Sequence, residues 1–159
     1  MRVFFSGQVP KDPLYPEAIE DSLDIRIADG RLALSDGASE SFDSKTWARI
    51  VTSQFVDDPA INPSWLDNCV KRYADQFDLQ TLSWSKQASF NRGSYATLLG
   101  AEVFPEKLAI DVMAVGDTIC AVIEDEELIG TFPYDQHEQF QQRPELFSTL
   151  SSNNAFVSD

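Results

Sequence analysis

Two amphipathic helical segments stand between two groups of alternating apolar residues, and this order constrains the fold more than any other feature of the chain. The first segment starts at Ser44, which can act as its N-cap, and Trp47, Ile50, Val51 and Phe55 then follow the spacing of one helix face. A helix with so wide an apolar stripe must bury it against another layer.

The second helical segment follows Pro59 and Pro63, with Asn62 or Ser64 available as its cap. Its apolar residues form two adjacent ridges, made by Trp65, Cys69 and Tyr73 and by Leu66, Val70, Tyr73 and Phe77. The two helices therefore form a pair, and the platform that we expect beneath them is a β-sheet.

A β-hairpin precedes the helices. Leu23, Ile25 and Ile27 alternate with polar residues, and the alternation resumes after the turn signal Asp29-Gly30. This pattern predicts a two-residue type I′ turn. In that register Asp36 faces Leu23 and is the diagonal neighbour of Asp21, with Cα atoms about 7–8 Å apart.

The first 22 residues contain Pro10, Pro13 and Pro16 and are predicted as an edge segment followed by loop. Strand patterns return after Gly93. The strands are predicted at residues 94–103, 108–115, 118–123 and 128–132. Their short connections indicate an antiparallel meander, and the tail from Tyr134 onward is predicted as loop with at most short helix. The fold class is therefore α+β, with antiparallel β-sheet layers covered by a helix pair in one domain of residues 1–159.

The charge of the chain excludes several classes of partner. With 26 Asp and Glu against 12 Lys and Arg, the formal net charge is −14, which disfavours nucleic acid and anionic membrane surfaces and favours divalent cations and basic partners. The best apolar stretch, residues 108–123, is interrupted by Asp111 and Asp117. Cys69 and Cys120 lie among apolar residues, and we interpret them as buried, reduced thiols of a cytoplasmic protein.

The predicted pair Asp21 and Asp36 suggests a metal site. Two carboxylates held close repel one another, and binding a hard divalent ion relieves this. Oxygen ligands without paired Cys or His favour Mg²⁺ or Mn²⁺ over zinc. Glu20 points to the other face of a regular strand, although at the strand end. The alternative is an acidic pair that simply faces water.

Four segments resemble motifs of the metal-dependent protein phosphatase family (PPM, or protein phosphatase 2C), above all its bacterial members, in the order in which that family has them. They are Ile19-Glu20-Asp21-Ser22, Asp36-Gly37-Ala38-Ser39-Glu40-Ser41 with Trp47-Ala48, Gly93-Ser94-Tyr95-Ala96-Thr97, and Gly116-Asp117-Thr118. The resemblance covers nearly the whole chain and implies a partial αββα sandwich that lacks the family's C-terminal part.

The resemblance also implies a function, the hydrolysis of phosphoserine or phosphothreonine on protein substrates through a dinuclear Mn²⁺ or Mg²⁺ centre that activates a water. Asp36 would bridge the metals and the Gly37 carbonyl would bind one of them. Glu20 and Asp21 would lie in the inner or outer shell of ligands, and Asp117 near an additional, weaker metal. The alternative for Asp117 is an ordinary turn.

Two departures from the family pattern leave a second hypothesis open. The family's remaining metal aspartates lie beyond the region that Asp159 reaches, and neither Lys11 nor Arg26 matches the arginine that many relatives use to hold the substrate phosphate. A catalytically inactive pseudo-phosphatase, acting as a regulatory or interaction module, is therefore the alternative. Trp47, Trp65 and Trp84 are interpreted as helix-to-sheet packing, and His137 as a surface residue.

Overall fold

The computed structural model describes residues 1–10 and 12–157 and has the mixed α and β content that the sequence predicts. The helices are α1 (Ser44–Asp57), α2 (Pro63–Ala74) and α3 (Trp84–Asn91). The strands are β1 (Ser22–Arg26), β2 (Arg31–Ser35), β3 (Tyr95–Ala96), β4 (Leu98–Phe104), β5 (Ala109–Val115), β6 (Cys120–Glu124), β7 (Glu127–Phe132) and β8 (Phe147–Ser148). Short 3₁₀ helices lie at Pro16–Ala18, Leu79–Thr81, Pro105–Lys107, His137–Gln141 and Ser151–Asn153.

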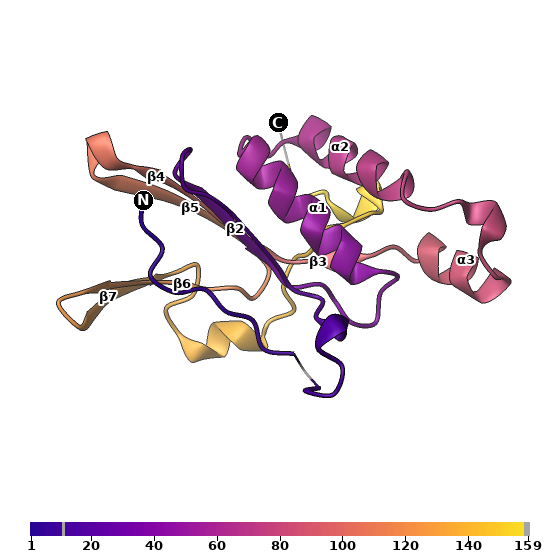
Figure 1. The fold of residues 1–159 in the computed structure, drawn as a ribbon, viewed down its shortest axis with the longest axis horizontal. Helices are drawn as coiled ribbons and strands as arrows, with labels where there is room; N and C mark the ends of the chain where they lie inside the picture. The colour runs from indigo at the N-terminus through magenta and orange to yellow at the C-terminus, as the bar shows by residue number, and fades with distance from the viewer. Residues whose placement is uncertain (11, 158–159) are drawn as a thin grey trace.

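An antiparallel four-stranded sheet in the order β1-β2-β4-β5 is the centre of the fold. Figure 1 shows this sheet between the helices on one side and the ribbon β6–β7 on the other. The α+β class with antiparallel sheets is therefore confirmed. The prediction of one meander after Gly93 is wrong, because β4 pairs with β2 and β5, while β6 pairs only with β7 in a separate ribbon.

The first hairpin forms, but its predicted turn and register are wrong. The pairs Arg26 with Arg31 and Leu23 with Leu34 show that four residues, 27–30, connect the strands. Within this loop only Gly30 takes a positive φ, at 69°, whereas a type I′ turn needs positive φ at both central residues. The register therefore differs from the prediction by two positions.

Helix α1 lies directly on the sheet through the apolar face that the sequence predicts. Trp47, Val51 and Phe55 are buried there, and a Cβ added at Gly100 of β4 would lie 2.3 Å from the ring of Phe55. Glycine at position 100 thus lets the helix approach the strand. The cap is Asp43, whose side chain accepts a hydrogen bond from the Thr46 amide, and not Ser44 as predicted.

Helix α2 packs on α1, and Asn62 caps it as predicted by accepting a hydrogen bond from the Trp65 amide. The Trp65 ring also contacts Phe147 of β8, at 5.8 Å between ring centroids. Because Trp47 and Trp65 are both buried, their predicted packing role is confirmed.

Two elements were not predicted, α3 and β8, and Trp84 is not a packing residue. Trp84 begins α3 with 83% of its surface exposed, and α3 has no fully buried residue. Its contact with the core is Phe90, whose ring lies 5.5 Å from that of Phe42. No helix in the part of the chain that the structure describes is both long and apolar enough to cross a bilayer.

Candidate functional site

The ends of β1 and β2 bring Asp21 and Asp36 together. The hairpin pairing ends with Ser22 opposite Ser35, and continuing it by one residue brings Asp21 opposite Asp36. Residues opposite each other in an antiparallel pair have Cβ atoms about 4.5–5.5 Å apart, closer than the diagonal neighbours that the sequence predicts. Ser22 contacts Thr52 of α1 and therefore points toward the helix. Because side chains alternate along a strand, Asp21 and Asp36 lie on the opposite face of the sheet, together with Leu23 and Leu34.

The two aspartates line one cavity of about 350 Å³. The rest of its lining comes from Gly7, Gln8, Val9, Leu34, Ser35 and Thr118. Thr118 is notable because its Oγ1 atom is buried and has no hydrogen-bond partner among the described residues. Buried polar atoms are normally hydrogen-bonded, so this hydroxyl is available to a ligand or water in the cavity.

Contacts through Thr97 join the segments that carry the sequence motifs. The Asp36 amide donates to Thr97 Oγ1 and the Thr97 amide donates to the Asp36 carbonyl, both at 2.9 Å. A Cβ at Gly116 would lie 2.5 Å from Thr97 Cγ2, so glycine is needed for this approach, and its φ of 101° also favours glycine. The turn before Thr118 is thereby held beside Asp36.

Gly37 has a steric reason to be glycine. A Cβ there would lie 2.8 Å from the carbonyl oxygen of Ser44, at the start of α1. Gly37 also forms an antiparallel β-bridge with Ala96. The two backbone hydrogen bonds of this bridge run from the Ala38 amide to the Tyr95 carbonyl and from the Thr97 amide to the Asp36 carbonyl. Its carbonyl takes no part in that bridge, which is compatible with the expected ligand role.

Glu20 lies on the other side of the strand end and outside the described lining of the cavity. Its carboxylate accepts hydrogen bonds from Ser39 Oγ, at 2.5 Å, and from Ser44 Oγ, at 2.9 Å. A carboxylate beside the first residue of α1 is favoured by the helix dipole. These bonds connect Glu20 to the start of the helix, whereas the resemblance implies a place in the inner or outer shell of metal ligands.

Asp117 is exposed and is adjacent in sequence to Thr118, but it is not in the described lining of the cavity. Of the five predicted metal residues, the structure therefore brings Asp21 and Asp36 together, with Gly37 next to Asp36 in the chain. Sequence reasoning missed the role of Thr118. The sequence signal for Thr118 was its position as a polar residue directly after Gly116-Asp117, in one of the four segments that resemble the family's motifs.

The donor set suits a hard cation but is small. Two carboxylates and a hydroxyl are oxygen ligands of the kind that Mg²⁺ and Mn²⁺ prefer, and Mg²⁺ commonly keeps several waters. Among residues 1–10 and 12–157, no group of three or more His, Cys, Asp or Glu side chains could hold a metal ion. The two aspartates would thus need the Thr118 hydroxyl, the Gly37 carbonyl or water as further ligands.

The cations near the motifs do not supply a phosphate clamp. Arg26 pairs with Asp57 on the α1 side of the sheet, and Lys11 lies outside the described residues. Arg92 donates to Ser89 Oγ and the Ala88 carbonyl of its own helix, and it lines a different cavity. No residue is therefore assigned to substrate binding.

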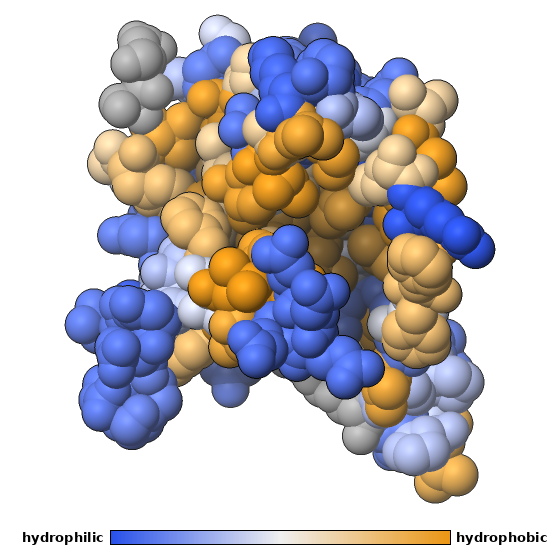
Figure 2. Space-filling view, turned by 90° about the vertical axis from the view of Figure 1, so that its left-hand side faces the viewer, coloured by the Kyte–Doolittle hydropathy of each residue, from blue (hydrophilic) through white to orange (hydrophobic). Residues whose placement is uncertain are grey.

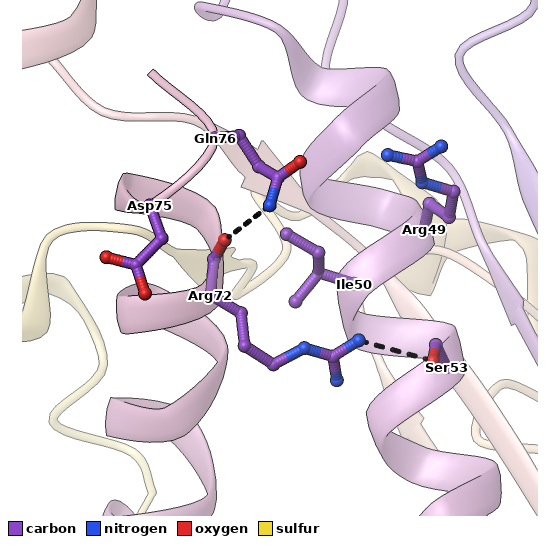
Figure 3. A pocket seen from close by; sticks show the side chains of 6 residues that line it. All are labelled: Arg49, Ile50, Ser53, Arg72, Asp75 and Gln76. Carbon is purple, nitrogen blue, oxygen red and sulfur yellow. Dashed lines mark hydrogen bonds between the residues drawn. The ribbon is translucent and has the colours of Figure 1, made fainter. Parts of the chain in front are cut away.

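A groove between α1 and the end of α2 forms another cavity, with a volume of about 370 Å³ (Figure 3). Arg72 reaches across it to Ser53 Oγ at 3.4 Å and to Gln54 Oε1 at 2.9 Å, and Gln76 bonds back to the Arg72 carbonyl. The groove has a single carboxylate in its lining, that of Asp75. These bonds join the two helices, and the groove lacks the paired acids of the first cavity.

The thiol of Cys69 does not provide a nucleophile in this core. Cys69 is buried, and burial raises the pKa of its thiol to about 12, with the charge of Arg72 opposing. A thiol held protonated at neutral pH is unreactive. Cys120 is also free but only half-buried, so the prediction that both thiols are buried holds for Cys69 alone.

Comparisons of the chain with protein-family models, with curated proteins and with solved structures found no match.

Proposed function

We propose that the chain is a metal-dependent phosphoprotein phosphatase of the PPM type, with its reaction centre at Asp21 and Asp36. The observation that carries the proposal is the meeting of these two carboxylates in one cavity with Thr118, beside Thr97 and Gly116. Residues from four separate motifs of the resemblance thus gather at one end of the sheet.

Asp36 and Asp21 would hold Mn²⁺ or Mg²⁺, with the Gly37 carbonyl and the Thr118 hydroxyl as further oxygen donors. Such an ion would neutralise charge on a phosphoryl group and lower the pKa of a bound water. The chain's own part is to hold both carboxylates in place, and the two bonds between the Asp36 backbone and Thr97 fix the backbone of Asp36. Asp117 and Glu20 would act around this centre, Glu20 through the serines that it contacts.

The proposed substrates are proteins phosphorylated on serine or threonine. The two free cysteines fit a reducing compartment, and we propose a cytoplasmic location on that basis.

The direct test is hydrolysis of p-nitrophenyl phosphate with and without Mn²⁺. We expect Mn²⁺-dependent turnover that falls to background in the variant Asp36→Ala. Asp24→Ala is the matched control, because Asp24 lies in the same hairpin, on β1, but opposite Ala33 and away from the acidic pair. Turnover without metal, or none with metal present, would refute the proposal.

A pseudo-phosphatase that serves as an interaction module is the second candidate, and a specific observation favours it. The described residues hold two facing carboxylates but no third acidic or histidine ligand beside them. This candidate predicts an intact fold that gains no thermal stability from Mn²⁺, since only a ligand that binds the folded state stabilises it.

A further inference from the structure

Strand β5 is an outer strand of the four-stranded sheet, and within the described residues it pairs only with β4. The Val103 amide bonds to the Gly30 carbonyl, so the backbone groups of odd-numbered residues of β4 point to β2 and those of even-numbered residues point to β5. The register of β4 and β5 then leaves Ile110, Val112 and Ala114 with their N–H and C=O groups on the open edge. Such a row of backbone groups can accept a further strand.

The other outer strand, β1, is protected in ways that β5 is not. It has five residues, of which Asp24 and Arg26 are charged, and α1 packs against it, with Arg26 paired to Asp57 of that helix. Strand β5 has seven residues, and Asp111 is the only charged one. Because short length, charge and a covering helix are the means by which proteins keep sheet edges from pairing, β5 is the outer strand that is open to pairing.

An apolar pocket lies beside β5, on the face of the sheet that carries α1. Met113 is on this face because it pairs with Gly100, which faces Phe55 of the helix. The pocket has a volume of about 290 Å³, and apolar side chains line it, those of Ile61, Met113, Val115, Phe147, Phe156 and Val157. A cavity of about 150 Å³ with such a lining takes up benzene, so this pocket has room for a leucine side chain.

The apolar surface around β5 is exposed. Leu108, which precedes the strand, is 95% exposed, Ile110 is 47% exposed, and Met113 and Phe156 at the pocket are 38% and 36% exposed. Figure 2 looks at the end of the molecule where the β4–β5 turn projects and shows hydrophobic side chains open to solvent between hydrophilic groups. The described chain therefore leaves apolar surface beside β5 for a partner to cover.

The charge of β5 decides which partner fits the edge. Asp111 lies on the same face as Met113, two positions away along the strand. A second copy of β5 would place no lysine or arginine opposite Asp111, since Ala109–Val115 contains none, and it would bring another −14 charge. A strand with a cation opposite Asp111 and an apolar residue opposite Met113 complements both the charge and the pocket.

We propose that the outer edge of β5 binds an extended segment of another protein as an added antiparallel strand. A leucine-like side chain of this segment fills the pocket, and a lysine or arginine two residues later faces Asp111. Main-chain bonds to Ile110, Val112 and Ala114 hold the segment, and the two side chains select it. The pocket shares no lining residue with the Asp21 and Asp36 cavity, so the inference does not depend on phosphatase activity.

The test uses the full chain and fluorescent peptides of seven residues, the length of β5. The reference peptide is Thr-Val-Leu-Val-Lys-Val-Thr, which in the antiparallel register places leucine opposite Met113 and lysine opposite Asp111. In fluorescence anisotropy, serine in place of leucine should weaken binding about tenfold, because the buried apolar side chain is lost. Glutamate in place of lysine should weaken binding several-fold, and this difference should shrink as salt is added.

Two methylated peptides test the main-chain pairing without any change in the protein. In the proposed register the amides of the valines point to β5, and those of leucine and lysine point away from it. N-methylation of the valines should therefore abolish binding, whereas N-methylation of leucine and lysine should leave most of it.

Two protein variants with matched controls locate the site. Asp111→Asn should remove most of the preference for lysine over glutamate, whereas Asp24→Asn on the other outer strand should keep it. Phe156→Ala should reduce the preference for leucine over serine, whereas Trp84→Ala, which removes an exposed ring from α3, should not. Circular dichroism checks that each variant is folded.

Three results would overturn the proposal. One is equal binding of all the peptides or binding of none, and another is an equal effect of the two methylation patterns. The third is a dimer in sedimentation that the reference peptide dissociates, because a second copy would then occupy the edge.

Discussion

Replacing Asp21 with asparagine should stabilise the metal-free protein and at the same time abolish its response to metal. Asp21 and Asp36 directly follow the pair Ser22–Ser35 at the strand ends, and both line one cavity. For carboxylates about 5–6 Å apart near the surface, Coulomb's law gives a repulsion of about 1 kcal/mol. Asparagine keeps the shape of the side chain and removes this repulsion, so Asp21→Asn should raise the midpoint of thermal unfolding by about 2–4 °C.

Metal should stabilise the wild-type protein but not Asp21→Asn. Mn²⁺ at about one hundred times its dissociation constant stabilises a folded protein by about 2.7 kcal/mol. In a chain of this size that corresponds to a rise of roughly 5–10 °C in the unfolding midpoint. We expect this rise in the wild-type protein and little or none in Asp21→Asn, because one of the two facing carboxylates is gone.

Thermal unfolding followed by circular dichroism, at low salt and with Mn²⁺ or EDTA, measures both effects. Asp24→Asn is the control for loss of one negative charge from the same strand, since Asp24 lies opposite Ala33. The reasoning fails if Asp21→Asn is no more stable than the control in EDTA, or if Mn²⁺ stabilises all three proteins equally.

Three further predictions follow from the packing. Gly37→Ala should cost about 1–3 kcal/mol in urea unfolding, because its Cβ would lie 2.8 Å from the Ser44 carbonyl oxygen; an unchanged midpoint would show that the loop relaxes freely. Gly100→Ala should cost about as much through its overlap with Phe55, and Phe55→Leu added to it should recover part of the loss, which a double-mutant cycle measures. Burial raises the pKa of Cys69 from 9.0 to about 12, so the stability that this protonated thiol contributes is complete below about pH 9 and declines toward pH 12. Between these pH values the free energy of unfolding in urea should therefore fall less steeply for Cys69→Ala than for the wild-type protein. Parallel curves for the two proteins would contradict the assignment.

Helices α1 and α2 were predictable from sequence because their apolar stripes are wide, and in α2 the cap was predictable as well. Asn62 caps α2 and Trp47 begins the buried face of α1, as the spacing indicates. The register of the first hairpin was not predictable from Asp29-Gly30, since this dipeptide also ends a four-residue loop in which only the glycine is left-handed. Helix α3 was missed because it buries little, and Trp84 is exposed for the same reason.

The candidate site was predictable where it depends on strand pairing and not where it depends on tertiary contacts. Asp21 and Asp36 meet because the strands pair, and the wrong register only changed them from opposite to diagonal neighbours. The position of Glu20 depends on Ser39 and Ser44, whose hydroxyls reach it only after the loop folds against α1. The burial of the Thr118 hydroxyl likewise depends on tertiary contacts, and the segment Gly116-Asp117-Thr118 indicates only a polar residue after a turn.

Calorimetric titration of Mn²⁺ into the protein tests most directly whether Asp21 and Asp36 form a metal site. The account predicts saturable binding in the wild-type protein and in Asp24→Asn, and its loss in Asp36→Asn. Binding heats that are the same in Asp36→Asn as in the wild-type protein, or absent from both, would contradict it.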